Sequence, residues 1–98
     1  MQEVIDHPDE LIGERQLSRL RWSCRRGLLE NDLFIERFFK RHERTLNLRQ
    51  AQALSALMDL SDNDLLDLHL ARKEIGAVNA ELDRPDVHEV LSMLREIP

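Results

Sequence analysis

The sequence predicts an all-α protein: a single domain folded as a compact five-helix antiparallel bundle. A length of 98 residues corresponds to one domain. Leu, Ala, Arg, Glu and Asp dominate the composition, Tyr is absent, and the three glycines and three prolines are scattered, which favours helices over a sheet. Short connections between the predicted helices favour antiparallel neighbours.

The chain is expected to begin with a flexible tail at residues 1–8, followed by a helical domain at residues 9–98. Asp9 is a candidate N-cap for the first helix, because a carboxylate can accept hydrogen bonds from the first free N–H groups. The candidate inward positions of this helix are Leu11, Leu17, Leu20 and Cys24.

The second predicted helix runs from about Leu28 to Glu43 and is the most apolar segment of the chain. At 100° per residue, one stripe forms from Leu28, Ile35, Phe38 and Phe39. The opposite side carries Glu30, Arg37 and Arg41. An apolar face of this kind predicts a helix that packs on the core.

Two shorter helices should follow. Thr45 or Asn47 can cap a helix near 48–60, with inward Leu54, Leu57 and Met58. Ser61 or Asp62 can cap a fourth near 63–73, which Gly76 ends. The inward candidates of this fourth helix are Leu65, Leu66, Leu68 and His69.

A predicted link at residues 77–83 leads to the last helix, which Pro85 opens. Its apolar residues recur at helical spacing, at Val87, Val90, Leu91, Leu94 and Ile97. This is the clearest amphipathic period in the chain, and it predicts the fifth helix of the bundle.

Charge is distributed unevenly along the chain, although the net charge is −5. A basic middle, residues 15–49, lies between two acidic segments, residues 1–14 and 50–98. Such a distribution steers partners more than it sets the fold. A lone cysteine excludes an internal disulfide, and no apolar run approaches 18 residues, so we expect a cytoplasmic protein without a membrane span.

Catalytic and metal-binding constellations are poorly supported, so no enzyme is predicted. The four histidines are far apart, at His7, His42, His69 and His88. Cys24 has no partner cysteine for zinc and is expected to pack as a small apolar residue. His69, among leucines, is expected to be a half-buried core residue. The acids Asp59, Asp62, Asp64 and Asp67 lack the glycine and terminal glutamate of a calcium loop, and helix capping explains Asp62 and Asp64.

The segment Arg26-Gly27-Leu28-Leu29-Glu30 interrupts a helix-forming region with a glycine. One interpretation is structural: Gly27 is the left-handed residue just after a helix end, Arg25 and Arg26 complement the helix dipole, and Arg26 pairs with Glu30 for ~0.2–0.5 kcal/mol. The other is an exposed docking patch, where Gly27 lets a partner backbone approach, Arg26 binds a carboxylate or phosphate, and Glu30 accepts from a partner donor.

The basic stretch raises a second question, because clustered arginines can neutralise phosphates. The negative net charge and acidic flanks argue against nucleic acid, so a solvated face or a patch for an acidic protein surface is preferred. Trp22 beside this stretch is either a core residue or an interface anchor.

The run Arg19-Leu20-Arg21-Trp22-Ser23-Cys24-Arg25-Arg26-Gly27-Leu28-Leu29-Glu30-Asn31-Asp32-Leu33, followed by Phe38-Phe39, resembles a known family. This is the family of SdhE-type succinate dehydrogenase assembly factors, which carry out flavinylation and were once classed as antitoxins. Its R-G-x-x-E hallmark is matched by Arg26, Gly27 and Glu30, inside a longer pattern that includes Trp22, Arg25 and Asp32. Residues 62–66 resemble its second signature, whereas Leu68 stands where members often carry Trp.

The resemblance implies a five-helix bundle that binds the flavoprotein subunit of succinate dehydrogenase, and of fumarate reductase, and promotes covalent FAD attachment there. FAD would be the client's cofactor, with none held stably by this chain. The implied partner-binding residues are Trp22, Arg25, Arg26, Gly27, Glu30 and Asp32. We expect a monomer. The alternative is a regulatory, antitoxin-like protein that binds a toxin or nucleic acid.

Overall fold

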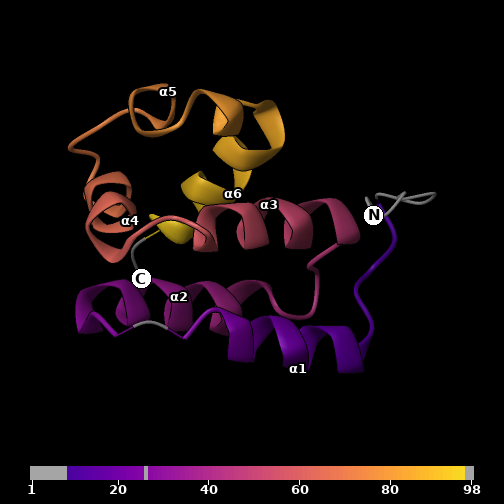
Figure 1. Cartoon of the computed structure of the whole chain (residues 1–98). Helices are drawn as coiled ribbons and strands as arrows, with labels where there is room; N and C mark the ends of the chain where they lie inside the picture. The colour runs from indigo at the N-terminus through magenta and orange to yellow at the C-terminus, as the bar shows by residue number, and fades with distance from the viewer. Residues whose placement is uncertain (1–8, 26, 97–98) are drawn as a thin grey trace.

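The computed structural model describes residues 9–25 and 27–96, and within this part of the chain it contains helices and no strand. Six α-helices and one 3₁₀ turn follow one another (Figure 1). Their bounds are α1 (Glu14–Ser23), α2 (Leu29–His42), α3 (Leu48–Met58), α4 (Asp62–His69), α5 (Ile75–Val78), η1 (Ala80–Leu82) and α6 (Pro85–Leu94). The all-α class is therefore confirmed.

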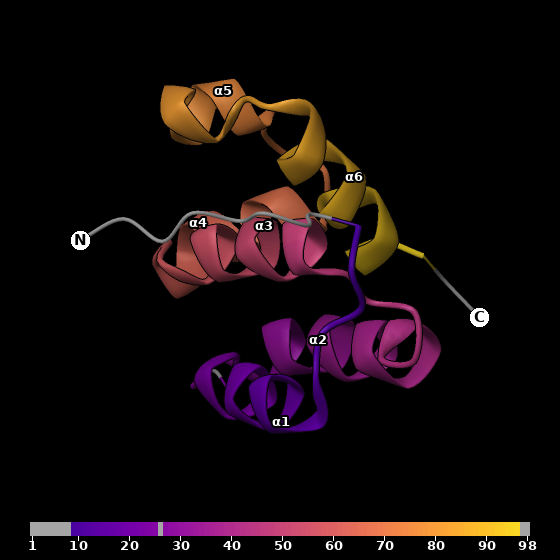
Figure 2. The same cartoon turned by 90° about the vertical axis from the view of Figure 1, so that its right-hand side faces the viewer.

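The helices are stacked in layers. Figures 1 and 2 show α1 and α2 on one side, α3 and α4 in the middle, and α5 on the far side. α6 packs mainly on α3, while α2 packs on both α4 and α6, and α1 on α3. The radius of gyration of 12.8 Å matches the ~13 Å expected of a compact domain of about 100 residues. This arrangement does not by itself confirm an antiparallel five-helix bundle.

Several predicted caps are present. Asn47 and Gln50 form a capping box at the start of α3, with bonds of 2.8 and 3.0 Å. Ser61 Oγ accepts from the Asp64 N–H at the start of α4, at 3.2 Å. Pro85 occupies the first turn of α6. These helix starts are local features, so sequence patterns identify them well.

The start of α1 differs from the prediction. Gly13, not Asp9, is the N-cap, and Leu11 is 59% exposed rather than inward. Residues 10–12 instead run alongside the segment before α3, where Ile12 N–H donates to Leu46 O and Leu48 N–H to Glu10 O, both at 2.9 Å. Pairing with this distant segment satisfies backbone groups that a longer helix would otherwise have satisfied.

The fourth helix is shorter than expected and a sixth helix is present. α4 ends at His69, and Gly76 lies within α5 instead of ending α4. A Cβ at Gly76 would lie 2.9 Å from Asp83 Oδ2, so the glycine allows α5 to approach this side chain. The predicted link at 77–83 contains the end of α5 and the 3₁₀ turn η1.

The core joins all the layers. Cys24 and the predicted inward residues of the second, third and last helices are buried, except that Leu28 is half-buried and Ile97 lies outside the described residues. The largest fully buried apolar side chains include Phe38, Leu46, Leu54, Leu57, Leu65, Leu68, Ile75 and Leu94. His69 is 3% exposed, so it is more deeply buried than the predicted half-buried residue.

The end of α4 contains a strained residue. Arg72 N–H donates to Asp67 O and Ala71 N–H to Leu68 O, at 2.8 and 3.1 Å, which is a Schellman ending. This ending requires a left-handed residue, and Ala71 has a φ of 57°. An alanine in this conformation costs about 1–2 kcal/mol.

An Ala71→Gly substitution is therefore expected to raise the free energy of unfolding by about 1 kcal/mol, because glycine adopts positive φ without a Cβ clash. Thermal denaturation followed by circular dichroism should show a midpoint higher by roughly 4–8 °C. The control is Ala77→Gly in α5, where the same substitution should lower stability. Equal destabilisation by both would contradict the assigned strain.

Candidate protein-docking site

The predicted docking residues gather at the corner between α1 and α2. Trp22 is 71% exposed, so it is not a core residue, and Arg25, Gly27 and Glu30 are also exposed. Asp32 is half-buried in the first turn of α2. Arg26 lies outside the described residues, and so does its predicted pairing with Glu30.

Gly27 is not explained by the chain's own backbone. α1 ends at Ser23 with Cys24 as its C-cap, so the position just past the helix belongs to Arg25, and the prediction that Gly27 is the left-handed cap is wrong. No described glycine has a positive φ. Among the described residues other than its chain neighbours, a Cβ at Gly27 would meet Asp62 Oδ2 alone, at 3.8 Å, which is an ordinary contact. An alanine would therefore fit this corner.

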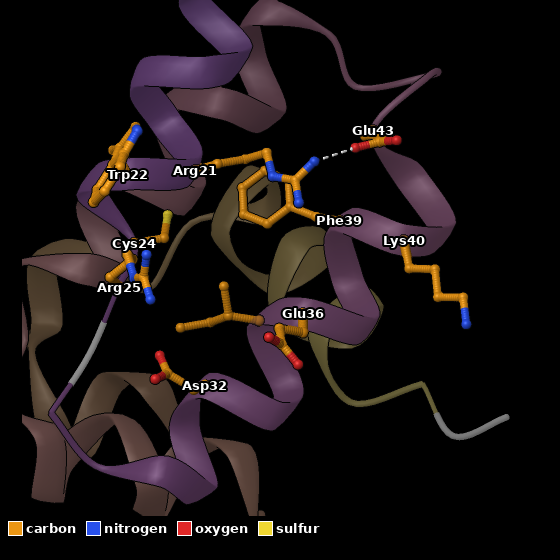
Figure 3. A pocket seen from close by; sticks show the side chains of 10 residues that line it. Arg21, Trp22, Cys24, Arg25, Asp32, Glu36, Phe39, Lys40 and Glu43 are labelled. Carbon is orange, nitrogen blue, oxygen red and sulfur yellow. Dashed lines mark hydrogen bonds and ion pairs between the residues drawn. The ribbon is translucent and has the colours of Figure 1, made fainter.

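A groove of about 550 Å³ opens beside the corner, between α1 and α2 (Figure 3). The end of α1 lines it with Arg21, Trp22, Cys24 and Arg25. The α2 side contributes Asp32, Ile35, Glu36, Phe39, Lys40 and Glu43. The two walls pack on different neighbours, α1 on α3 and α2 on α4 and α6. Three of the predicted site residues line it, whereas Gly27 and Glu30 do not.

Two arginines of the groove are held by aromatic rings. The Arg25 guanidinium lies 5.1 Å from the centre of the Trp22 ring, and that of Arg21 lies 5.5 Å from the Phe39 ring. Arg21 also donates to Glu43 at 2.7 Å, as Figure 3 shows. Arg21 and Glu43 therefore neutralise each other and join α1 to the end of α2.

α2 is anchored near its start by a residue that sequence reasoning missed. Asn31 is fully buried, and its amide nitrogen donates to Asp62 O at 2.9 Å and faces the Asp62 carboxylate at 3.4 Å. Because the NH₂ group faces these acceptors, Asn31 Oδ1 is the acceptor for His69 Nδ1, at 3.0 Å. Asn31 thus ties both ends of α4 to α2. Its position on the same helix face as Ile35 and Phe38 could have indicated from sequence that Asn31 is buried.

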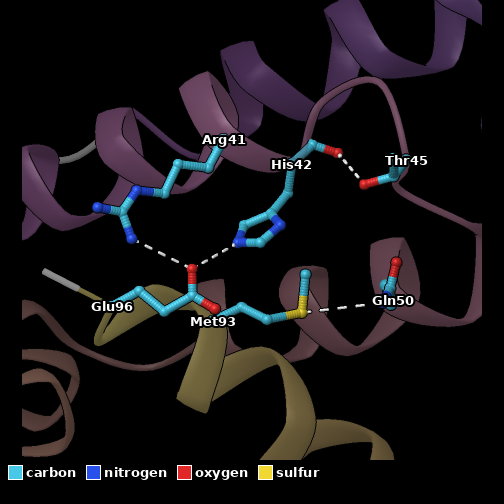
Figure 4. A network of polar contacts seen from close by, with 6 residues as sticks. All are labelled: Arg41, His42, Thr45, Gln50, Met93 and Glu96. Atoms are coloured by element: carbon cyan, nitrogen blue, oxygen red, sulfur yellow. Dashed lines mark hydrogen bonds and ion pairs between the residues drawn. The ribbon is translucent and has the colours of Figure 1, made fainter. Parts of the chain in front are cut away.

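A second anchor holds the far end of α2. The Glu96 carboxylate binds Arg41 Nη1 at 3.2 Å and His42 Nε2 at 3.0 Å (Figure 4). The hydrogen bond from His42, with help from Arg41, lowers the pKa of Glu96 below its ordinary value. The contact therefore favours the folded chain above the ordinary pKa of a glutamate and is lost as the pH falls through the lowered pKa.

Exposed apolar side chains lie next to the corner. Leu29 is 68% and Leu33 44% exposed, one turn apart on the outward side of α2. With Trp22 they place apolar area beside charged groups, as protein interfaces do. These two leucines were part of the predicted apolar segment, but their outward direction was not foreseen.

The structure gives no support to a metal site or to a nucleic-acid surface in the described part of the chain. No group of three potential metal ligands occurs among residues 9–25 and 27–96. Within the acidic cluster, Asp67 faces Arg72 and Lys73 at 3.6 and 3.4 Å. The basic stretch is partly neutralised, since Arg21, Arg41 and Arg49 all face glutamates.

Every helix in the described part of the chain is too short or too polar to serve as a membrane span.

The fold and the corner together define a small helical binding protein, whose distinctive surface is an exposed patch around a glycine. The chain belongs to the family of the flavinator of succinate dehydrogenase, whose model matches residues 18–98. Leu68, which stands where members of the family often carry Trp, is fully buried. This departure therefore concerns the core and not the exposed corner.

Curated relatives agree with this assignment. The chain is 54% identical over 80 residues to the FAD assembly factor SdhE of Ralstonia nicotianae, covering 82% of this chain and 81% of that protein. It is 39% identical over 49 residues to the same factor of Coxiella burnetii, covering 50% and 60%. It is 33% identical over 89 residues to the mitochondrial succinate dehydrogenase assembly factor 2-B of Drosophila willistoni, covering 91% and 54%. No solved structure matches significantly.

These relatives are named as assembly factors, which agrees with the prediction that this chain is not an enzyme. The match to the flavinator family also agrees with the resemblance found in the sequence. The comparisons give no support to the antitoxin alternative.

Proposed function

We propose that this chain is an FAD assembly factor that binds the flavoprotein subunit of succinate dehydrogenase and promotes covalent attachment of FAD to it. Membership of the flavinator family and the high identity to an FAD assembly factor support this function. The fumarate reductase flavoprotein is proposed as a second client, on the resemblance alone. FAD is the client's cofactor, and the factor itself holds none stably.

One observation supports the corner as the docking patch. Gly27 is exposed, and the chain's own packing leaves room for a Cβ there. The fold of the chain does not itself require a glycine at this position, but close approach of a partner's backbone would require one. Arg26 and Glu30 would then bind polar groups of the client, with Trp22, Arg25 and Asp32 around them.

The mechanism we propose is control of the client's geometry. The flavin supplies the chemistry of its own attachment, and proteins around it supply orientation. A factor that binds the attachment-competent conformer tenfold more tightly than the others enriches it tenfold, which requires ~1.4 kcal/mol of differential binding. α2, anchored through Asn31 and Glu96 at its two ends, is a firm platform for such binding.

The remaining parts of the proposal are architectural. We propose that residues 9–98 act as one domain and a monomer in the cytoplasm, with the five longer helices arranged as an antiparallel bundle. The cytoplasmic location is supported by the single cysteine, Cys24, which is buried and forms no disulfide within the chain.

Reconstitution tests the function. The apo flavoprotein subunit is incubated with FAD in the presence and absence of this chain, and protein-bound flavin is measured by fluorescence after denaturing electrophoresis. Covalent flavin should accumulate faster with the factor, and the two proteins should co-elute in gel filtration. An unchanged rate together with no complex would exclude the proposed function.

A further inference from the structure

The groove between α1 and α2 carries charged side chains that form no ion pair with the described residues. Within residues 9–25 and 27–96, the structure shows no ion pair of Arg25, Glu36 or Lys40, although all three line the groove. At the far end, Arg21 and Glu43 are already paired at 2.7 Å. Arg25 and Glu36 therefore lie nearer the corner than this pair, whereas Lys40 lies on the Glu43 side of the groove (Figure 3).

The two walls of the groove carry different charges: the α1 side presents Arg25, and the α2 side presents Glu36 with Lys40 one turn further along. Arg25 belongs to the end of α1, whereas Glu36 belongs to α2. A partner that covers the groove removes water from both groups, which is unfavourable unless each receives an opposite charge. The groove therefore selects a partner with a matching pair of charges and disfavours one without them.

Trp22 gives this surface an anchor of the type found at interfaces. One face of its ring is stacked by Arg25 at 5.1 Å, which limits the freedom of both side chains before binding. The ring is nevertheless 71% exposed, so most of its apolar area remains to be buried. Tryptophan and arginine are also the residue types that most often dominate binding energy.

From these observations we infer that the α1–α2 groove receives a polar segment of the client flavoprotein. In this complex Glu36 binds a basic side chain of the segment, Arg25 binds an acidic one, and Trp22 packs against the segment between them. The inference rests on the proposed function, because Trp22 and Arg25 belong to the docking corner and make the groove continuous with it. A space of about 550 Å³ accommodates a few side chains of such a segment.

Charge reversal on each wall tests this inference. Glu36→Lys and Arg25→Glu should each weaken binding of the apo flavoprotein subunit at least tenfold, measured by biolayer interferometry at physiological salt. Matched controls are Glu81→Lys in η1 and Arg15→Glu at the start of α1, both at exposed positions, which should bind within twofold of the native chain. Circular dichroism should show the same helix content in all four variants.

Trp22 provides a direct probe, because it is the only tryptophan of the chain. With 5-fluorotryptophan incorporated, the single ¹⁹F signal should shift or broaden when the unlabelled flavoprotein subunit is added. It should not change when FAD alone is added, or when the concentration of the chain itself is raised. A change with FAD would make the groove a flavin site, a change with concentration would make it a self-association surface, and either would overturn the inference.

The outcomes separate the groove from the function. If the native chain binds the client and speeds flavin attachment while both reversal variants bind as well as their controls, the groove proposal is wrong and the proposed function stands. If the native chain does not bind the client at all, the proposed function fails first.

Discussion

Gly27→Arg is expected to abolish binding of the flavoprotein subunit and to reduce covalent flavin to the level seen without the factor. The position is exposed, and among the described residues beyond its chain neighbours Asp62 alone would contact an added Cβ, so we expect the folded chain to accommodate an arginine. It would nevertheless hold a partner several ångströms away from the corner. The measurements are flavin fluorescence of the denatured client and co-elution of the two proteins.

Two controls separate this effect from misfolding and from added charge. Gly27→Ala places a Cβ 3.8 Å from Asp62 Oδ2 and should retain the native stability, with binding reduced less than in the arginine variant. Gly13→Arg places the same side chain on an exposed glycine at the start of α1 and should leave flavin attachment unchanged. Normal attachment by a folded Gly27→Arg chain would remove the corner from the proposal.

Asn31→Ala is expected to lower the free energy of unfolding more than most substitutions of a polar residue. It removes the acceptor of His69 Nδ1 and the donor to Asp62 from a fully buried position. Loss of such partners costs about 1–3 kcal/mol, and a domain of this size loses roughly 4–8 °C of melting temperature for each kcal/mol. Urea unfolding at constant pH measures the change directly.

A double substitution of Asn31 and His69 tests whether loss of their mutual hydrogen bond causes the destabilisation. Replacing Asn31 and His69 together by leucine exchanges a buried polar contact for an apolar one and should recover most of the stability lost in Asn31→Leu alone. Asn63→Ala, at an exposed position of α4, is the control and should change stability by less than about 0.5 kcal/mol. A double variant as unstable as the single one would show that the two side chains are not coupled.

Several structural elements could be predicted from the sequence because the interactions that form them are local. The apolar period of α6, Pro85 in its first turn, and the caps Asn47 and Ser61 depend on residues within one or two turns. The predictions failed where a distant segment intervened. Residues 10–12 pair with the backbone around Leu46, and Arg95 binds Leu68 O with two nitrogens, at 2.8 and 2.6 Å, near the end of α4.

The residues proposed for docking also divide into a part that was predictable from sequence and a part that was not. Trp22, Arg25, Gly27, Glu30 and Asp32 were predictable as a set because they are close in sequence and form one signature. The groove was not predictable, since its walls belong to two helices that pack on different neighbours, α1 on α3 and α2 on α4 and α6. Asn31 and His69 are 38 residues apart, so no local pattern joins them.

By itself, the sequence determined the helical class, the family, and the buried faces of the second, third and last helices, because helix periodicity and a short signature depend on neighbouring residues. Only the tertiary structure decided that Trp22 faces outward, that Gly27 has room for a side chain, and that Arg25 and Glu36 stand across a shared groove. These facts depend on how whole helices pack against one another, and that packing is set by many weak contacts between residues far apart in the chain.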